Sequence, residues 1–144
     1  MALLKDIRIL LGKSKSEPKP MHASKKILIV EDEEILLTMY KDKFVIEGFE
    51  VVTAQNGEEG LHKAHHHKPD IILLDLMMPV MDGKAMLRKL REVPVFKNLP
   101  VIVLTNAGDI ENIKETQHFE NAAEFLIKSN VGIEEIVMKV KVWL

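Results

Sequence analysis

The chain has 144 residues, 47% of them hydrophobic, and a formal net charge of −2 at pH 7, which suits one globular domain with a short additional segment. It contains no cysteine, so thiol catalysis, disulfide bonds and cysteine-based zinc sites are excluded. No apolar stretch approaches the ~20 residues that span a bilayer, and no secretory signal is evident, so we expect a cytoplasmic location.

The first residues differ from the rest of the chain in charge. Residues 1–26 carry seven Lys and Arg against two Asp and Glu, whereas the remainder carries 13 against 20. We interpret residues 1–24, the leader, as a basic N-terminal segment, and residues 12–25 as a flexible linker that ends where the globular domain begins. The acidic remainder gives no electrostatic reason to bind nucleic acid.

Part of the leader has helical spacing, and its apolar residues would share one face: Leu3, Leu4, Ile7, Leu10 and Leu11. Such a face could dock on a partner or rest on a membrane surface. About eleven residues are marginal for an isolated helix. Alternatively, translation begins at Met21, just before the globular domain.

Strand and helix patterns alternate five times after the leader. Short apolar runs predict strands at 26–30, 50–53, 70–74, 100–104 and 122–126. Each is followed by a segment with helical spacing, and this alternation implies right-handed crossovers around a parallel sheet. We therefore predict one α/β domain over residues 25–144.

Helices are predicted at 33–46, from 56, at 83–91, at 110–118 and from 133 to the end of the chain, so that Trp143 and Leu144 are helical. Gly48 is placed to end the first helix in a left-handed conformation. Asn56 followed by Glu59 resembles a capping box, and Asp82 and Asp109 are the expected caps of the third and fourth helices. The apolar residues expected on the buried face of the first helix are Ile35, Leu36, Met39, Phe44 and Val45.

Polar side chains stand where four of the strands end. Glu31 and Asp32 follow the first strand, Asp75 the third, Thr105 the fourth and Lys128 the fifth. Open parallel sheets bind ligands at this edge. Crowded carboxylates repel one another unless a cation is present, and Mg²⁺ prefers oxygen ligands and phosphate substrates. Acids after strands can also cap helices, and for Asp32 alone that reading stays open.

Asp75 is the best nucleophile candidate in this set. A carboxylate can attack phosphorus and carry an acyl phosphate, a reaction that demands mainly positioning and charge neutralisation. Mg²⁺ and Lys128 would neutralise charge, and the Thr105 hydroxyl would donate to a phosphoryl oxygen. Considered singly, Lys128 could equally be a surface lysine and Thr105 a loop hydroxyl.

Four segments carry a resemblance to a known family. They are Ile-Leu-Ile-Val-Glu-Asp-Glu (27–33), Pro-Asp-Ile-Ile-Leu-Leu-Asp-Leu-Met-Met-Pro-Val-Met-Asp-Gly (69–83), Pro-Val-Ile-Val-Leu-Thr (100–105) and Ala-Ala-Glu-Phe-Leu-Ile-Lys (122–128). With them the chain resembles the receiver domain of bacterial two-component response regulators, in its stand-alone, chemotaxis-regulator-like form. This resemblance implies a flavodoxin-like, doubly wound, five-stranded parallel sheet in the order 2-1-3-4-5 with helices on both faces.

The resemblance also implies a phosphorylation-activated signalling switch that is not an enzyme. Asp75 would accept phosphate from a sensor histidine kinase or a histidine phosphotransfer protein. Glu31, Asp32, Asp75 and the backbone carbonyl of Met77 would hold Mg²⁺.

The family further implies how the signal leaves the site. Lys128 would pair with the acyl phosphate, and Thr105 and Phe125 would move as the switch. A downstream protein would then bind the face of the fourth helix, fifth strand and fifth helix. Direct nucleic-acid binding is not expected, and the chain would be a monomer or a phosphorylation-dependent dimer.

Several positions depart from the family pattern. Ser129 follows Lys128 where proline is usual, and we expect a trans peptide bond because a non-proline cis bond costs about 3 kcal/mol. Glu31 replaces the commoner Asp, so the side chain that would bind the metal is longer by one methylene group. Met77 and Ala107 offer no group to orient a hydrolytic water, which predicts a long-lived phosphoryl state.

Two other functions compete with the switch. One is an aspartate-nucleophile phosphatase of the haloacid dehalogenase type, although Met77 stands where those enzymes place a second Asp. The other is a pseudo-receiver that only binds a partner. His62 and His66 could form a metal pair on the second helix, but no third ligand is evident and a solvated helix end is favoured.

Overall fold

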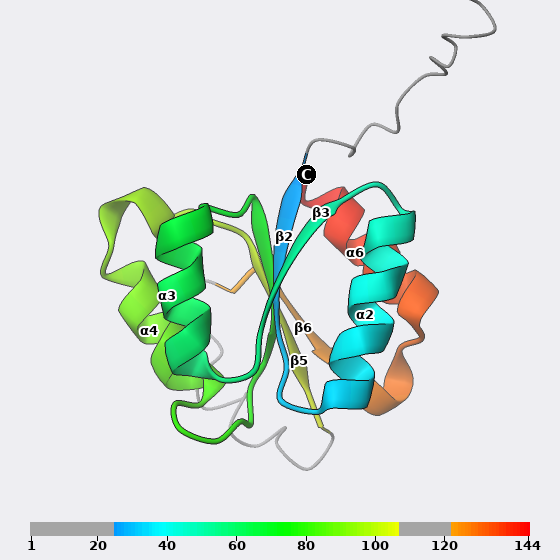
Figure 1. Cartoon of the computed structure of the whole chain (residues 1–144), viewed down its shortest axis with the longest axis horizontal. Helices are drawn as coiled ribbons and strands as arrows, with labels where there is room; N and C mark the ends of the chain where they lie inside the picture. The colour runs from blue at the N-terminus through cyan, green and yellow to red at the C-terminus, as the bar shows by residue number, and fades with distance from the viewer. Residues whose placement is uncertain (1–24, 107–121) are drawn as a thin grey trace, which may run out of the picture.

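A computed structural model describes residues 25–106 and 122–144 (Figure 1). Five parallel strands form one sheet: β2 (Lys26–Val30), β3 (Glu50–Ala54), β4 (Ile71–Asp75), β5 (Val101–Thr105) and β6 (Glu124–Ile127). Their order, β3-β2-β4-β5-β6, confirms the predicted order 2-1-3-4-5. The predicted strand bounds agree to within two residues.

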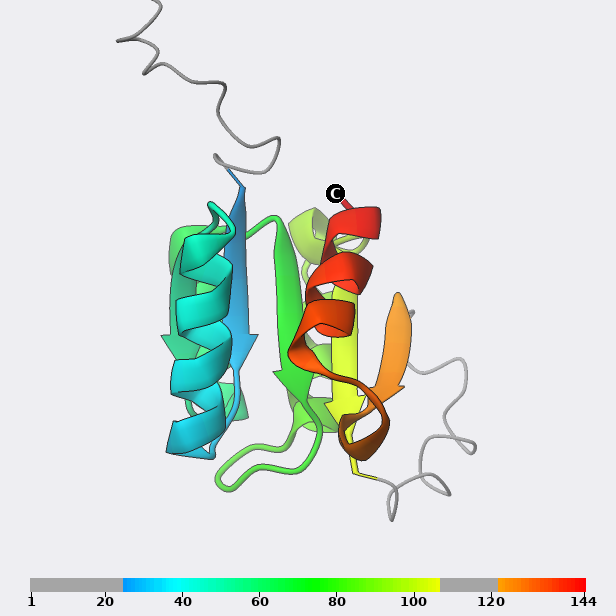
Figure 2. The same ribbon diagram turned by 90° about the vertical axis from the view of Figure 1, so that its right-hand side faces the viewer.

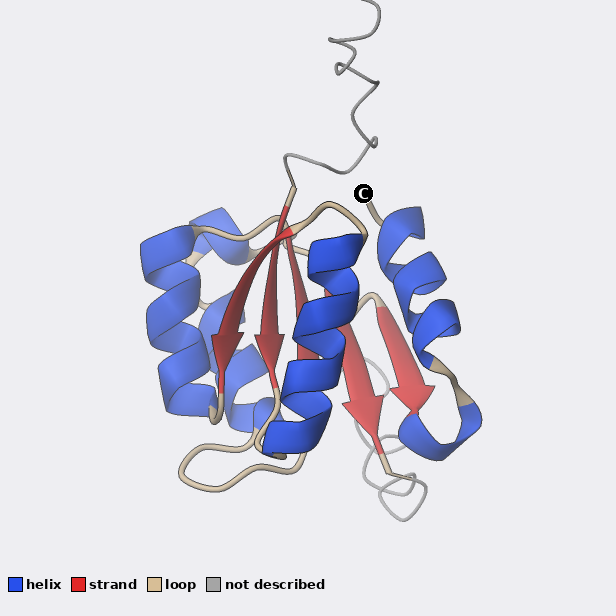
Figure 3. Cartoon of the chain, turned by 45° about the vertical axis from the view of Figure 1, so that its right-hand side comes forward, coloured by secondary structure: helices blue, strands red, loops and turns tan. Residues whose placement is uncertain are grey.

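Helices cover both faces of the sheet, as expected for a doubly wound fold (Figures 1 and 3). One face carries α2 (Glu34–Ile46) and α6 (Ile133–Val142), and the other carries α3 (Gly57–His67) and α4 (Gly83–Arg91). Two short 3₁₀ helices, η2 (Pro94–Phe96) and η5 (Lys128–Asn130), were not predicted. The predicted helix at 110–118 and its cap Asp109 lie outside the described residues.

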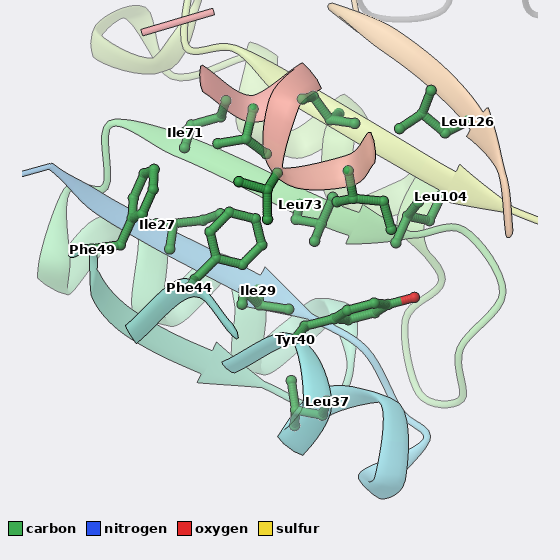
Figure 4. Close-up of a cluster of buried hydrophobic side chains, with 14 residues drawn as sticks. Ile27, Ile29, Leu37, Tyr40, Phe44, Phe49, Ile71, Leu73, Leu104 and Leu126 are labelled. Carbon is green, nitrogen blue, oxygen red and sulfur yellow. The ribbon is translucent and has the colours of Figure 1, made fainter. Parts of the chain in front are cut away.

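The strand side chains alternate between two apolar clusters, one on each face of the sheet. In β2, Ile27 and Ile29 point to the cluster under α2 and α6 (Figure 4), whereas Leu28 and Val30 point to the cluster under α3 and α4. All four are essentially inaccessible to solvent. Burial on both faces explains why the strands read as uninterrupted apolar runs.

The end of α2 is fixed as predicted. Gly48 has φ 98°, a left-handed conformation that glycine adopts without strain. The backbone N–H of Phe49 donates to the carbonyl of Phe44 at 3.0 Å, and that of Gly48 donates to Val45 at 3.0 Å. The two Phe rings pack edge to face with centroids 5.2 Å apart. This is a Schellman motif with its hydrophobic contact.

The predicted caps of α3 and α4 are also present. The Asn56 side chain accepts a hydrogen bond from the N–H of Glu59 at 2.8 Å, and Asp82 accepts one from Ala85 at 2.9 Å. The Glu59 carboxylate accepts from the N–H of Gln55 rather than from Asn56, so the capping box is displaced by one residue.

The predicted buried face of α2 is partly wrong. Phe44 is buried and Leu36 is half-buried, but the other two buried residues of this helix are Leu37 and Tyr40. The wrongly assigned residues are exposed, by 84% for Ile35, 44% for Met39 and 52% for Val45. Apolar side chains occur all round this helix, so periodicity alone does not select the face that meets the sheet.

The last helix ends earlier than predicted, at Val142, and Trp143 is its C-cap. The N–H of Trp143 donates to the carbonyl of Val140, and that of Leu144 to Lys141, each at 3.1 Å. These i→i−3 bonds tighten the final turn and satisfy terminal carbonyls.

The two edges of the sheet carry different parts of the chain. The start of β2 and the end of α6 lie at one edge, and the strands point toward the other (Figures 1 and 2). No helix in the described ranges is long and apolar enough to cross a membrane.

Candidate functional site

The predicted site residues meet at the carboxyl edge of the sheet, toward which all five strands point (Figures 2 and 3). Asp75 and Thr105 are the last residues of β4 and β5, while Glu31 and Lys128 directly follow β2 and β6. The register sets these ends level, because Asp75 pairs with Leu104 and Thr105 pairs with Ile127. A parallel sheet therefore brings together residues almost 100 positions apart in sequence.

Three acids form the centre of the site. Glu31, Asp32 and Asp75 each offer a carboxylate oxygen, and these oxygens all lie within 4.8 Å of one another. Glu31 is 1% exposed and Asp75 3% exposed, whereas Asp32 is half-buried. No other group of three potential metal ligands occurs in residues 25–106 and 122–144, so the exposed pair His62 and His66 has no third ligand there.

Glu31 is held by the start of α2. Its Oε2 accepts a hydrogen bond from the backbone N–H of Glu33 at 3.0 Å. Its Oε1 is fully buried and receives no hydrogen bond of good geometry. The charge that faces this oxygen is the Lys128 ammonium, whose Nζ lies 3.0 Å away.

Lys128 bridges two of the acids. Its Nζ lies 3.0 Å from Glu31 Oε1 and 3.3 Å from Asp75 Oδ1, and its side chain is 14% exposed. The chain contains no cis peptide bond in the described ranges, so the bond to Ser129 is trans, as predicted. The 3₁₀ turn that begins at Lys128 directs the chain away from β6.

Burial dominates the electrostatics of the site. The pKa of Asp75 is raised from 3.8 to about 7, mainly because the carboxyl is buried; the Glu31 carboxylate adds to the rise and Lys128 opposes it. Burial also raises the pKa of Glu31. Burial acts to lower the pKa of Lys128, but its contacts with Glu31 and Asp75 outweigh that effect and raise it. One cation thus does not fully offset two buried carboxylates.

Two glycines that the sequence reasoning missed support the loop after Asp75. A Cβ on Gly83 would lie 2.5 Å from the carbonyl oxygen of Asp75, and one on Gly57 would lie 2.4 Å from that of Met81. The N–H groups of these glycines donate to Leu76 and Met81, both at 2.8 Å. The close approach requires glycine, and it fixes the segment that contains Met77.

The same loop contains a strained residue. Val80 has φ 67°, which is unusual for a β-branched side chain, and it is 76% exposed. The N–H of Met81 donates to the carbonyl of Pro79 at 2.7 Å, closing a γ-turn around Val80.

The predicted switch residues come from the two strands beyond β4: Thr105 ends β5, and Phe125 lies within β6. Thr105 is fully buried, and its hydroxyl donates to the carbonyl of Asn106 at 3.4 Å. Phe125 is half-buried against the cluster under α3 and α4. Tyr40 was not predicted to be near the site. Its ring is buried with the hydroxyl at the border of the apolar cluster (Figure 4), and burial raises its pKa while the charges of Lys128 and the acids also act on it.

Comparison with known proteins identifies the family. The Response regulator receiver domain family matches residues 27–141, so the chain belongs to this family. Its fold and its cluster of acids are those of receiver domains, which are signalling switches and bind Mg²⁺ at an acidic pocket. Receiver domains work with histidine kinases or phosphotransfer proteins and with downstream targets.

Individual relatives support this assignment. The alkaline phosphatase synthesis transcriptional regulatory protein PhoP of Bacillus subtilis is 42% identical over 82 residues, which are 57% of this chain and 33% of PhoP. The chain thus spans about a third of the length of that relative. The chemotaxis response regulator CheY4 of Vibrio cholerae has 29% identity and a TM-score of 0.76 over 84% of this chain and 99% of CheY4.

A third relative was solved with a metal. The receiver domain of the sensor histidine kinase PA1611 of Pseudomonas aeruginosa has 25% identity and a TM-score of 0.75, covering 84% of this chain and 98% of that one. A magnesium ion is coordinated in its active-site cleft.

The residues of this chain fit a divalent cation. The site offers only oxygen ligands, which suits Mg²⁺. The buried Glu31 Oε1 that lacks a hydrogen bond and the raised pKa of Asp75 both indicate uncompensated negative charge.

Proposed function

We propose that this chain is a phosphorylation-dependent switch in which Asp75 accepts the phosphoryl group of a phosphohistidine on a sensor kinase or phosphotransfer protein. An Asp75 oxygen forms the new O–P bond while the N–P bond breaks, and the imidazole leaves with the electron pair and takes up a proton. The proposal rests on one observation at the carboxyl edge of the sheet. Three carboxylates lie close together there, and two of them contact Lys128.

Glu31, Asp32, Asp75 and the backbone carbonyl of Met77 would hold Mg²⁺. When bound, Mg²⁺ supplies positive charge that favours the ionised, nucleophilic form of Asp75 and offsets the charge of the phosphoryl oxygens. The magnesium ion in the PA1611 receiver supports this assignment.

Lys128 and Thr105 would act on the phosphoryl group itself. Lys128 contacts Asp75 at 3.3 Å, so it lies beside any charge added to that side chain. Thr105 ends β5, the strand next to β4. Its hydroxyl would give up its hydrogen bond to the Asn106 carbonyl and donate to a phosphoryl oxygen instead. Movement of Thr105 would let Phe125 swing inward.

The change would be transmitted to the surface that contains β6 and α6. A downstream protein would bind there, and the face would also include the predicted helix at 110–118, which lies outside the described residues. The chain would act in the cytoplasm as a monomer or as a phosphorylation-dependent dimer.

The test is phosphorylation by acetyl phosphate with Mg²⁺, followed by intact-mass measurement. We expect one phosphate on the wild-type chain and none on Asp75→Asn. Asp42→Asn removes an exposed carboxylate of α2 and should leave the phosphate in place. A wild-type chain that gains no phosphate would reject the proposal.

Two further measurements separate the alternatives. Turnover of a generic phosphate ester that is lost in Asp75→Asn would favour a phosphatase. A magnesium titration without binding, together with no phosphate uptake, would favour a pseudo-receiver.

A further inference from the structure

The outer face of α6 carries exposed apolar side chains. Met138 is 65% exposed and Val142 74% exposed, and they lie four residues apart on one side of the helix. Together with Glu134, Glu135 and Lys139 they line a shallow groove of about 600 Å³. Met138 and Val142, unlike the apolar residues on the opposite side of α6, are not covered by another element within the described residues.

The groove carries unbalanced negative charge. Glu134 pairs with Lys43 of α2 at 2.7 Å, and Lys139 pairs with Glu124 of β6 at 3.5 Å. Glu135 is exposed and forms no ion pair within residues 25–106 and 122–144. A ligand that combines an apolar face with positive charge would therefore complement this surface.

The leader has that chemistry. Five of its apolar residues share one helical face, and Arg8 lies at the flank of that face, whereas Lys5 lies nearly opposite it. Over residues 1–24 it carries five Lys and Arg against two Asp and Glu. As a helix, the nine residues from Leu3 to Leu11 would be about 13 Å long, close to the roughly 12 Å rise from Glu134 to Val142.

The leader also joins the domain at the right place. The chain enters the described structure at Lys25, at the edge of the sheet where α6 ends (Figures 1 and 2). The 13 residues from 12 to 24 span up to about 45 Å when extended. As a flexible chain they would have a root-mean-square span of about 20 Å. This tether would hold the leader near α6 at a millimolar effective concentration.

We propose that the leader binds the outer face of α6 in its own chain, placing its apolar stripe on Met138 and Val142 and Arg8, at the flank of that stripe, beside Glu135. The site containing Asp75 lies at the other edge of the sheet, so the bound leader leaves it open (Figure 2). If the proposed function holds, the leader covers part of the face that a downstream protein would use, and the two compete.

The absence of cysteine allows a direct test on the full chain. A nitroxide attached through Ala2→Cys should broaden backbone amide signals most strongly over residues 134–142. A second chain carrying Ile7→Asn and Leu11→Asn should lose this localised broadening, because the apolar stripe is interrupted.

The matched surface variants separate α6 from other exposed apolar positions. Met138→Gln with Val142→Thr should abolish the localised broadening, whereas Ile35→Gln with Met39→Gln on α2 should not change it. Broadening that survives the α6 variant, or that centres on α2, would overturn the proposal.

Two other occupants are outcomes of the same test. In a mixture, one chain carries the nitroxide but no ¹⁵N, and the other carries ¹⁵N but no nitroxide. This mixture should give no localised broadening; if it does, α6 binds the leader of a second copy and the proposal is wrong. Binding to phosphatidylglycerol vesicles with no broadening on α6 would likewise overturn it in favour of a membrane surface. Asp75→Asn should retain the docking, so loss of phosphate uptake and loss of docking are independent results.

Discussion

Replacing Asp75 by Asn should stabilise the metal-free protein, and increasingly so as the pH rises. The folded pKa of Asp75, about 7, lies well above its ordinary value of 3.8. Each pKa unit corresponds to about 1.36 kcal/mol, so an ionised Asp75 costs about 4 kcal/mol of stability when fully deprotonated.

The sign of the pH dependence follows from proton binding. Between the two pKa values the folded state holds a proton on Asp75 that the unfolded state has released, so stability falls as the pH rises. Below about pH 4 Asp75 is protonated in both states and causes no loss of stability. The full loss, about 4 kcal/mol, is reached by about pH 7 to 8. Asn removes this titration, so its advantage over Asp should grow by about 3 kcal/mol between pH 5 and pH 8.

The assay is urea denaturation followed by circular dichroism at several pH values, with EDTA to remove metal. The free energies of unfolding of the wild type and Asp75→Asn are compared at each pH, so that packing differences common to all pH values cancel. Asp42→Asn, on the exposed surface of α2, controls for the loss of one negative charge. An advantage of Asn that stays constant from pH 5 to pH 8 would refute the argument that burial of charge controls this site.

Three other changes test separate parts of the site. Lys128→Met leaves two buried carboxylates without their cation and should lower the free energy of unfolding at pH 8 by about 3 kcal/mol, measured by urea denaturation. Lys63 is more exposed, so Lys63→Met should lower it by less than about 1 kcal/mol. Val80→Gly should raise stability by about 1 kcal/mol by relieving the left-handed conformation, seen as a higher melting temperature, whereas an unchanged or lower value would show that the turn is not strained. The phosphoryl group on Asp75 should be long-lived in Mg²⁺ buffer and shorter-lived in Met77→Asn, measured by loss of phosphate over time; rapid loss from the wild type would contradict this.

The parallel sheet could be predicted from local patterns in the sequence, whereas the order of its strands was implied by the resemblance to receiver domains. Uninterrupted apolar runs such as 71–74 require burial on both faces of a sheet. Parallel strands must then place every residue at a strand end on the same edge, and the order implied by the resemblance makes the strands of Glu31 and Asp75 neighbours. Their meeting with Lys128 could therefore be expected without knowledge of any side-chain contact.

Features that depend on how elements pack could not be predicted in this way. The buried side of α2 is decided by the sheet beneath it, which selects Leu37 and Tyr40 over Ile35 and Met39 although all four are large. The need for glycine at position 83 arises from the approach of α4 to the carbonyl of Asp75, two elements that no sequence pattern places at a given distance.

The cost of ionising Asp75 links the stability of the domain to its proposed switch. Moving a two-state equilibrium from 1:99 to 99:1 takes about 5.5 kcal/mol, and ionising Asp75 in the folded protein already costs about 4 kcal/mol. A phosphoryl group adds negative charge to the same pocket, where Lys128 is already shared with Glu31. A conformation that brings a further donor such as Thr105 to that charge would recover part of the cost. The driving force for the change would thus be the incomplete neutralisation of the acids in the unmodified protein.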